Sequence, residues 1–451
     1  MQKPKLGFIT FGHTYFDPLG DKVGLTESAK VAWADLPFAL IPSPEIPKDV
    51  AVTVKMTEFF EEQGVHGIVI NAGAYGFENL ATVLGVNTSL PLLVWCPLKT
   101  TQGLIPITTF FATMANMNHL NRQIFPLVGN VDSPELKDGL IAFSRACLAA
   151  KMLRRAILGI VGSHCPGMLD TTFSEFHLRR FIPGLLSLDT QDILDAMAAV
   201  TQSEIQEAIV KIKATFGGVT AEESHMAVAA RSYIAMKNIV KSYNLNAITI
   251  RCWPELSKKG FSGSLGSSLL FDEGIICMLE CDVPATATAL VFYYLTGQPS
   301  YIGEIDCIDV EANQAHFVND NSMPSSLVSS KAEHQIIDGD IFIYITTGKP
   351  DGLNIKGTLK PGPITLAKLQ GTPKDGNNLA MGITIGEVAP FTPKEGTLIN
   401  AHVKFKQPIH DFLYTWAKKG FEHHMVINHN LVVKELKMLC EIIGVKPDIL
   451  I

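Results

Sequence analysis

Two carboxylates, Glu280 and Glu304, lie at the ends of apolar segments that are close together in the chain. Residues 275–279 form an apolar run with the length of a buried strand, and Glu280 follows this run directly. Asp282 and Pro284 then have the residue types of a helix N-cap and a first helical turn. Because ligands bind at the carboxyl ends of strands in open α/β sheets, we interpret Glu280 and Glu304 as the centre of a metal site.

Three histidines later in the chain could complete such a site: His316 and the adjacent pair His423 and His424. Carboxylates with one or two imidazoles suit Mn²⁺ or Mg²⁺ better than Zn²⁺, and the chain has no CxxC pair that would favour zinc. These residues could instead have ordinary structural roles. Glu280 would then be an exposed acid at a strand end, Glu304 a surface residue and His316 a hydrogen-bonded loop histidine. In an extended segment His423 and His424 would point in opposite directions, which predicts that only one of them faces the site.

The composition indicates a large α/β protein. The chain has 451 residues, which is long enough for two or three domains. Hydrophobic residues make up 47% and charged residues 18%, a balance typical of parallel sheets that are covered on both faces. The net charge of −7 argues against a nucleic-acid partner.

Targeting signals are not apparent in the sequence. It contains no uncharged apolar stretch of about 18 residues, and its first residues lack the layout of a signal peptide. The 8 cysteines are scattered, which predicts free thiols in a reducing compartment. We therefore expect a cytoplasmic protein with no membrane-spanning segment.

The order of predicted elements indicates an α/β fold: two Rossmann-like, doubly wound parallel-sheet domains and a C-terminal β-rich, barrel-like domain. Strands and helices alternate in residues 1–153 and again in residues 154–305. Short β-rich runs punctuated by Gly and Pro then dominate residues 306–451, which end with a helix. These three ranges are the predicted domains.

Three local patterns make further predictions. Thr220 and Glu223 have the spacing of a capping box, which predicts a helix over residues 220–243. Residues 257–268 are rich in Gly and Ser and predict a loop. Residues 341–346, IFIYIT, are β-branched and aromatic, which predicts a strand.

Five motifs in the middle and at the end of the chain resemble the L-fucose and L-arabinose isomerase family, in the same order and with similar spacing. They are AITIRCWPE at 247–255, LECDVPATATALVFYYLTGQP at 279–299, GEID at 303–306, AHFVNDNSMPSSL at 315–327 and GFEHH at 420–424. The N-terminal part of the chain is similar only in its α/β rhythm. Together the five motifs cover the candidate metal site.

The resemblance implies an enzyme that interconverts an aldose and a ketose through an ene-diol intermediate, assisted by Mn²⁺ with Mg²⁺ or Co²⁺ as alternatives. Glu280 matches the first acidic ligand, which also transfers the proton, and Glu304 matches the second acidic ligand. We expect the two carboxylates to form the acid/base pair. His424 matches the third ligand. A divalent ion can bind both sugar oxygens and stabilise the negative charge that develops on them.

Further residues are expected to bind the substrate, a small sugar or sugar derivative. The resemblance places Arg251 and Glu255 in a motif beside the site, and His316 and His423 near the ligands. It also implies a homo-oligomer, either a trimer or a hexamer.

Two other interpretations of the sequence remain open. A non-catalytic sugar-binding protein could be built from two Rossmann-like lobes, although the missing export signal and the late cluster of acids and histidines count against it. Another metal-dependent sugar enzyme, an epimerase or a dehydratase, would need a similar ligand set.

Overall fold

The structure is a computed structural model of the chain. It describes residues 2–12, 24–73, 75, 78–98, 105–319, 322–391 and 399–451. The chain forms two compact units, one of Met1–Lys151 with Lys434–Ile442 and one of Met152–Val433 with Ile443–Ile451. The finer division at residues 153 and 305 stays a prediction.

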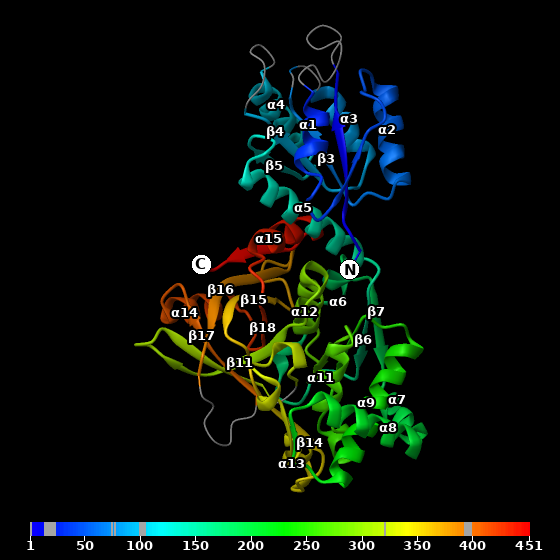
Figure 1. Cartoon of the computed structure of the whole chain (residues 1–451), viewed down its shortest axis with the longest axis vertical. Coiled ribbons are helices and arrows are strands. Elements are labelled where there is room, and N and C mark those ends of the chain that lie inside the picture. Colours follow the sequence, from blue (N-terminus) through cyan, green and yellow to red (C-terminus); the bar gives the residue numbers. More distant parts are fainter. Residues whose placement is uncertain are drawn as a thin grey trace. The chain divides into compact units, whose positions relative to one another are not determined.

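The first unit is built on a five-stranded parallel sheet in the order β2-β1-β3-β4-β5 (Figure 1). Its strands are β1 Lys5–Thr10, β2 Ala39–Pro42, β3 Gly67–Asn71, β4 Leu92–Cys96 and β5 Ile124–Val128. Helices α2 Val50–Glu62, α3 Glu78–Asn87 and α4 Pro106–His119 share one apolar core with the sheet. Helices α1 Leu25–Ala32, α5 Pro134–Leu153 and α15 Val433–Ile443 contribute to a second core. The predicted parallel α/β sheet is confirmed for this unit.

A second parallel sheet, with four strands in the order β10-β9-β6-β7, opens the second unit. Its strands are β6 Ile157–Val161, β7 Gly184–Leu188, β9 Ala247–Ile250 and β10 Ile276–Leu279. Val161 and Leu279 are both in register with Ile250, so three strands end at one level. Glu280 and Arg251 therefore leave the sheet side by side at its carboxyl edge, where α/β proteins bind ligands.

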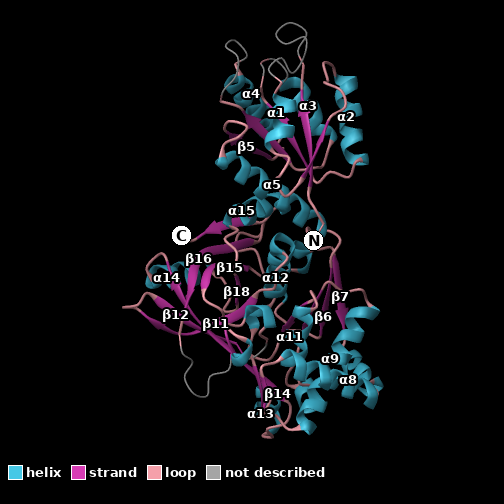
Figure 2. Cartoon of the chain, viewed as in Figure 1, coloured by secondary structure: helices cyan, strands magenta, loops and turns pink. Residues whose placement is uncertain are grey.

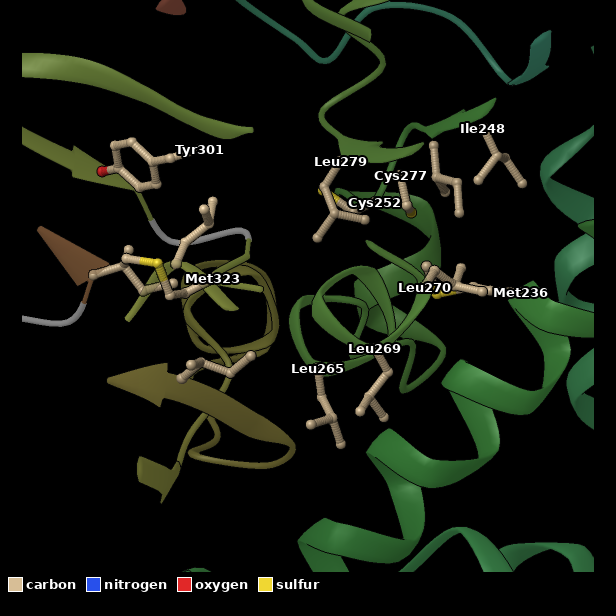
Figure 3. Close-up of a cluster of buried hydrophobic side chains, with 14 of the residues drawn as sticks. Met236, Ile248, Cys252, Leu265, Leu269, Leu270, Cys277, Leu279, Tyr301 and Met323 are labelled. Carbon is tan, nitrogen blue, oxygen red and sulfur yellow. The ribbon is translucent and has the colours of Figure 1, made fainter. Parts of the chain in front are cut away.

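The helices of this sheet are α6 Glu175–Leu178, α7 Thr190–Ala199, α8 Gln202–Thr215, α9 Glu223–Ser242, α10 Glu255–Lys258, α11 Ser264–Asp272 and α12 Val283–Thr296 (Figure 2). Figure 3 shows an apolar core of the second unit, to which Leu265, Leu269 and Leu270 of α11 contribute together with Leu279 and Met236. Leu279 is fully buried, so this core anchors the strand end that precedes Glu280.

The remaining strands of the second unit form a ten-stranded mixed sheet. They are β8 Gly218–Val219, β11 Tyr301–Asp309, β12 Gln314–Asn319, β13 Gln335–Asp338, β14 Leu353–Thr358, β15 Gly362–Leu369, β16 Ala380–Ala389, β17 Ile399–Phe405, β18 Met425–Asn428 and β19 Lys446–Ile449. An additional antiparallel pairing of β16 with β17 closes the series β16-β15-β18-β11-β12-β17 into a ring. Two helices, α13 Ile341–Thr347 and α14 Ile409–Lys419, lie within this part of the chain.

Two local predictions are wrong. Residues 341–346 are in α13, because Asp340 accepts hydrogen bonds from the first backbone N–H groups and Gly348 ends the helix, so the caps override the β-propensity. Residues 257–268 form a loop only over residues 259–263, because α10 ends at Lys258 and α11 begins at Ser264. A Cβ atom on Gly266 would lie 2.8 Å from the sulfur of Met236, so this glycine allows α11 to pack closely on α9.

The predicted capping box is also absent from the described helix. Helix α9 starts at Glu223 with Glu222 as its N-cap, and no side chain caps it. The hydroxyl of Thr220 donates instead to the backbone oxygen of Ile336 on β13. Among the described residues, no helix is both long and apolar enough to cross a membrane.

Candidate active site

The site begins at a strained turn between β10 and α12. Glu280 and Cys281 both have positive φ angles, 66° and 57°, in a region that residues with a Cβ atom rarely adopt. Asp282 then caps α12, because its Oδ1 accepts a 2.7 Å hydrogen bond from the backbone N–H of Ala285. The predicted N-cap is therefore confirmed.

Glu280, Glu304 and His424 come together in space although they are far apart in sequence. The Nε2 atom of His424 lies 3.2 Å from a carboxylate oxygen of Glu280 and 3.5 Å from one of Glu304. Strand pairing explains this arrangement, because Gly303 on β11 is in register with Met425 on β18. The residues next to them, Glu304 and His424, are thereby held opposite one another.

His424 is completely buried, and each ring nitrogen has a different environment. Nδ1 lies 2.8 Å from Oδ2 of Asp282, whereas Nε2 has no hydrogen bond of good geometry among the described residues despite its closeness to Glu280. Burial by itself lowers the pKa of His424, but the interactions with Asp282 and Glu280 outweigh burial and raise the pKa to about 10. Without a cation, the imidazole therefore carries the positive charge that balances the acids.

Asp282 is held by a second buried cation, Lys368. The Nζ atom of Lys368 lies 3.0 and 2.8 Å from the two carboxylate oxygens, and neither side chain is exposed. Burial opposes the charge of Asp282, but the Lys368 ammonium and the hydrogen bond with His424 hold its pKa well below its usual range. Because an ionised carboxylate only accepts hydrogen bonds, Nδ1–H of His424 is the donor.

Both histidines of the pair lie at the site, so the prediction that only one of them faces it is wrong. Their rings are 4.0 Å apart between centroids, and Nε2 of His423 lies 3.8 Å from Glu304. Nδ1 of His423 donates to the carboxylate of Asp170, and this hydrogen bond lowers the pKa of Asp170 against the effect of burial. The alternation of an extended strand does not apply here, since β18 begins only at Met425.

The arrangement of donor atoms fits a divalent cation. Glu304, His423 and His424 each offer a ligand atom, and these atoms lie within 4.8 Å of one another. Glu280 is outside this group of three, but it lies 3.2 Å from Nε2 of His424. The Nε2 atom of His424 is a buried nitrogen that faces two carboxylates, while its other nitrogen is bound to a third. Such a carboxylate–histidine pair is the usual support of a metal-binding imidazole.

Arg251 and Glu255 are paired beside the carboxyl edge of the parallel sheet. Arg251 donates hydrogen bonds to Glu255 at 2.9 Å and to Ser163 at 3.2 Å. Ser163 lines a pocket of about 260 Å³ that also reaches the turn after Glu280. The lining residues are Ile160, Gly162, Ser163, His164, Thr171, Thr172, Phe173, Glu175, Ser187, Cys281 and Val283. The pocket thus lies next to Ser163, the partner of Arg251, and next to the turn that follows Glu280.

His316 is not among the residues that meet at His424. Its Nδ1 atom lies 3.1 Å from Asp306, and with Asp306 and Cys307 it forms a second group of closely spaced donor atoms. A register shift between Ile305 and Cys307 interrupts the pairing of β11 with β12 at this point. Its predicted role in substrate binding stays a prediction.

Two residues at the site were not predicted: Lys368, which donates to Asp282, and Asp170, which accepts from His423. One signal was available for Lys368, because it is a cation in the otherwise apolar segment ITLAKL of β15. An inward-pointing lysine in such a strand requires a buried acidic partner. No comparable signal marks Asp170, which lies in an exposed turn.

Comparisons with known proteins give distant relatives. No protein-family model matches the chain. A sulfoquinovose isomerase from Alkalicoccus urumqiensis is 22% identical over 358 residues, which cover 77% of this chain and 78% of that protein. A sulfoquinovose isomerase from Priestia megaterium is 21% identical and covers 80% of each chain.

Solved structures add little to this comparison. A periplasmic sugar-binding protein from Legionella pneumophila has 14% identity over 66% of this chain and 97% of its own, with a TM-score of 0.17. A solute-binding protein from Agrobacterium vitis, bound with α-D-tagatopyranose, has the same TM-score and covers 66% of this chain and 90% of its own. These TM-scores are too low to support a structural argument.

Proposed function

We propose that this protein is an aldose–ketose isomerase that acts on a small sugar or sugar derivative. The observation that carries the proposal is the convergence of Glu280, Glu304 and His424, with carboxylate oxygens 3.2 and 3.5 Å from one buried imidazole nitrogen. Distant relatives that are named sulfoquinovose isomerase support the class of reaction. The five motifs that resemble the L-fucose and L-arabinose isomerase family contain all three residues.

In this proposal Glu280, Glu304 and His424 hold Mn²⁺, with Mg²⁺ or Co²⁺ as alternatives. When bound, the ion supplies Lewis-acid stabilisation of negative charge on two neighbouring sugar oxygens. Asp282 keeps one proton of His424 on Nδ1, so that Nε2 would bind the cation once it has released its own proton. His423, anchored by Asp170, adds a further nitrogen at the rim of the site.

The two acids are placed to move the proton. Isomerisation removes a proton from one carbon of the sugar and returns a proton to its neighbour, with an ene-diol between the two steps. The Glu280 side chain is 13% exposed and that of Glu304 is 42% exposed, so the two carboxylates have different access to solvent. We propose Glu280 and Glu304 as the acid/base pair, with Glu304 on the more open side.

The pocket beside the turn supplies space for the rest of the sugar. Its lining residues include Ser163, Thr171 and Thr172, and it reaches Cys281 directly after Glu280. Hydroxyl groups both donate and accept hydrogen bonds, as binding of a polyol requires. Arg251 and Glu255 position Ser163 in this pocket, which is the role proposed for them in substrate binding.

Product analysis tests the proposal. The protein with Mn²⁺ is incubated in D₂O with sulfoquinovose, L-fucose, D-arabinose or L-arabinose, and the products are identified by NMR. We expect a ketose from at least one aldose in the wild type, and none in Glu280→Gln or Glu304→Gln. A surface change on α8, Ser203→Ala, is the matched control and should keep wild-type turnover.

Other products would replace the proposal with a specific alternative. An epimer or a dehydrated sugar would identify an epimerase or a dehydratase. Sugar binding that is unchanged by a chelator, with no turnover, would identify a sugar-binding protein. Wild-type Mn²⁺ occupancy in both Glu280→Gln and His424→Ala would refute the metal site.

A further inference from the structure

A chain of three buried charged side chains lies behind the site. Lys368, Asp282 and His424 each have 0% exposed side-chain surface, and they come from β15, the start of α12 and the loop before β18. Strand β15 pairs with β18, with Ala367 in register with Val426. These three bonded side chains therefore connect three elements of the second unit without contact with solvent.

Every acceptor position of the Asp282 carboxylate is used. Oδ1 accepts from the backbone of Ala285 at 2.7 Å and from Lys368 at 3.0 Å, and Oδ2 accepts from Lys368 and His424, both at 2.8 Å. Two carboxylate oxygens offer about four lone pairs, so no free position remains. Lys368 is the one of these three donors that contacts both oxygens, so its ammonium restrains the rotation of the carboxylate.

We propose that Lys368 is a positioning residue that sets the orientation of His424 through Asp282. The only carboxyl group that Lys368 contacts in the described ion pairs is that of Asp282. Lys368 therefore acts on the site indirectly, through Asp282. Packing alone does not explain a lysine here, since an apolar pair of the same size is often equally stable. The ammonium of Lys368 holds the carboxylate of Asp282 in one orientation. Because this carboxylate binds Nδ1 of His424, the direction of Nε2 is then fixed as well.

A second carboxyl group, that of Glu422, lies near the same ammonium. Burial raises the pKa of Glu422, although Lys368 acts in the opposite direction, and one of its oxygens accepts from the backbone N–H of Gly371 at 2.6 Å. Glu422 is held by this backbone contact, and among the described hydrogen bonds it has none to Lys368. Asp282 is thus the group through which Lys368 reaches the site.

The test compares metal binding in three variants. Lys368→Met removes the ammonium, Lys368→Gln keeps a side-chain donor without the charge, and Leu366→Ala removes buried packing from the same strand. We expect Lys368→Met to weaken Mn²⁺ binding, measured as Kd by calorimetry, about 10- to 100-fold, which is typical of changes behind a metal ligand. Lys368→Gln should lie between this variant and the wild type, and Leu366→Ala should keep the wild-type Kd.

A second readout uses the metal-free protein and does not depend on the proposed function. The hydrogen-bonded Nδ1–H of His424 should give a slowly exchanging downfield proton signal in NMR, assigned by its loss in His424→Gln. We expect this signal to move or vanish in Lys368→Met and to persist in Leu366→Ala. If the wild type binds no Mn²⁺, the proposed metal site fails, while this comparison still decides the role of Lys368.

Three outcomes would overturn the inference. One is a folded Lys368→Met protein with wild-type Kd and an unchanged Nδ1–H signal. Another is an equal loss of Mn²⁺ affinity in Leu366→Ala, which would indicate a merely structural role. If neither lysine variant folds, the NMR spectrum of the wild type is the test. We expect a lysine ammonium signal that is protected from exchange and has a cross-peak to Nδ1–H of His424. The absence of this signal would contradict the inference.

Discussion

The Nδ1 atom of His424 donates a 2.8 Å hydrogen bond to the carboxylate of Asp282, a residue 142 positions earlier in the chain. The same carboxylate caps helix α12, so one side chain both starts a helix and orients an imidazole. This double role links the strained turn at Glu280 to the loop before β18.

Stability should depend on pH through His424. Its pKa in the folded protein is about 10, above the ordinary value of 6.5, so its contribution to stability is complete below pH 6.5 and is lost as the pH rises through about 10. The pKa of Asp282 is lowered, so its contribution is present above its ordinary pKa and is lost in strong acid. Thermal unfolding of metal-free wild type and His424→Gln should show a Tm difference that shrinks between pH 6.5 and pH 10. A difference that grows with pH would contradict the assignment.

Removal of one partner from the buried ion pair should destabilise the protein. Lys368→Met leaves the Asp282 carboxylate without its ammonium, and we expect a loss of about 3–5 kcal/mol in the free energy of unfolding. The double variant with Asp282→Asn removes the buried charge and keeps a capping oxygen for α12, so it should lose less than the sum of the single variants. Urea denaturation measures all four proteins. Strictly additive losses would mean that Lys368 and Asp282 are not coupled.

Because the backbone at Glu280 is left-handed, a glycine variant should be more stable there than an alanine variant, which reverses the usual order of stability. Both Glu280→Ala and Glu280→Gly remove the carboxylate, but only glycine adopts a φ of 66° without strain. We expect the glycine variant to be more stable by about 1 kcal/mol in chemical denaturation. At Glu207, an exposed position in helix α8, the same two changes should give the ordinary order, with alanine more stable. The same order at both positions would argue against strain at Glu280.

Obstruction of the pocket should weaken substrate binding more than metal binding. Ser163→Phe places a ring in the 260 Å³ pocket, so we expect KM to rise several-fold while Mn²⁺ affinity and Tm stay near the wild-type values. Ser203→Phe, on an exposed position of α8, serves as the control. An unchanged KM in Ser163→Phe would show that the sugar does not enter this pocket.

Local sequence was sufficient for the elements that carry the acids. The apolar run before Glu280 and the capping residue Asp282 predict a strand and a helix, and the structure has β10 and α12 in these places. Such features depend on neighbours in the chain, so they can be read from residue types. Local rules failed at residues 341–346 and 257–268, where capping contacts and close helix packing outweighed propensity and composition.

The sequence by itself determined the residue types at the site, which are acids at Glu280 and Glu304 and paired histidines at 423 and 424. It also determined the parallel α/β character of the five-stranded and four-stranded sheets. Only the tertiary structure decided which of these groups meet, because strand register between β11 and β18 places Glu304 opposite His424. It also decided that Lys368 supports Asp282, since that contact joins residues 86 positions apart. Register and packing between distant segments arise from the whole fold, and no short stretch of sequence encodes them.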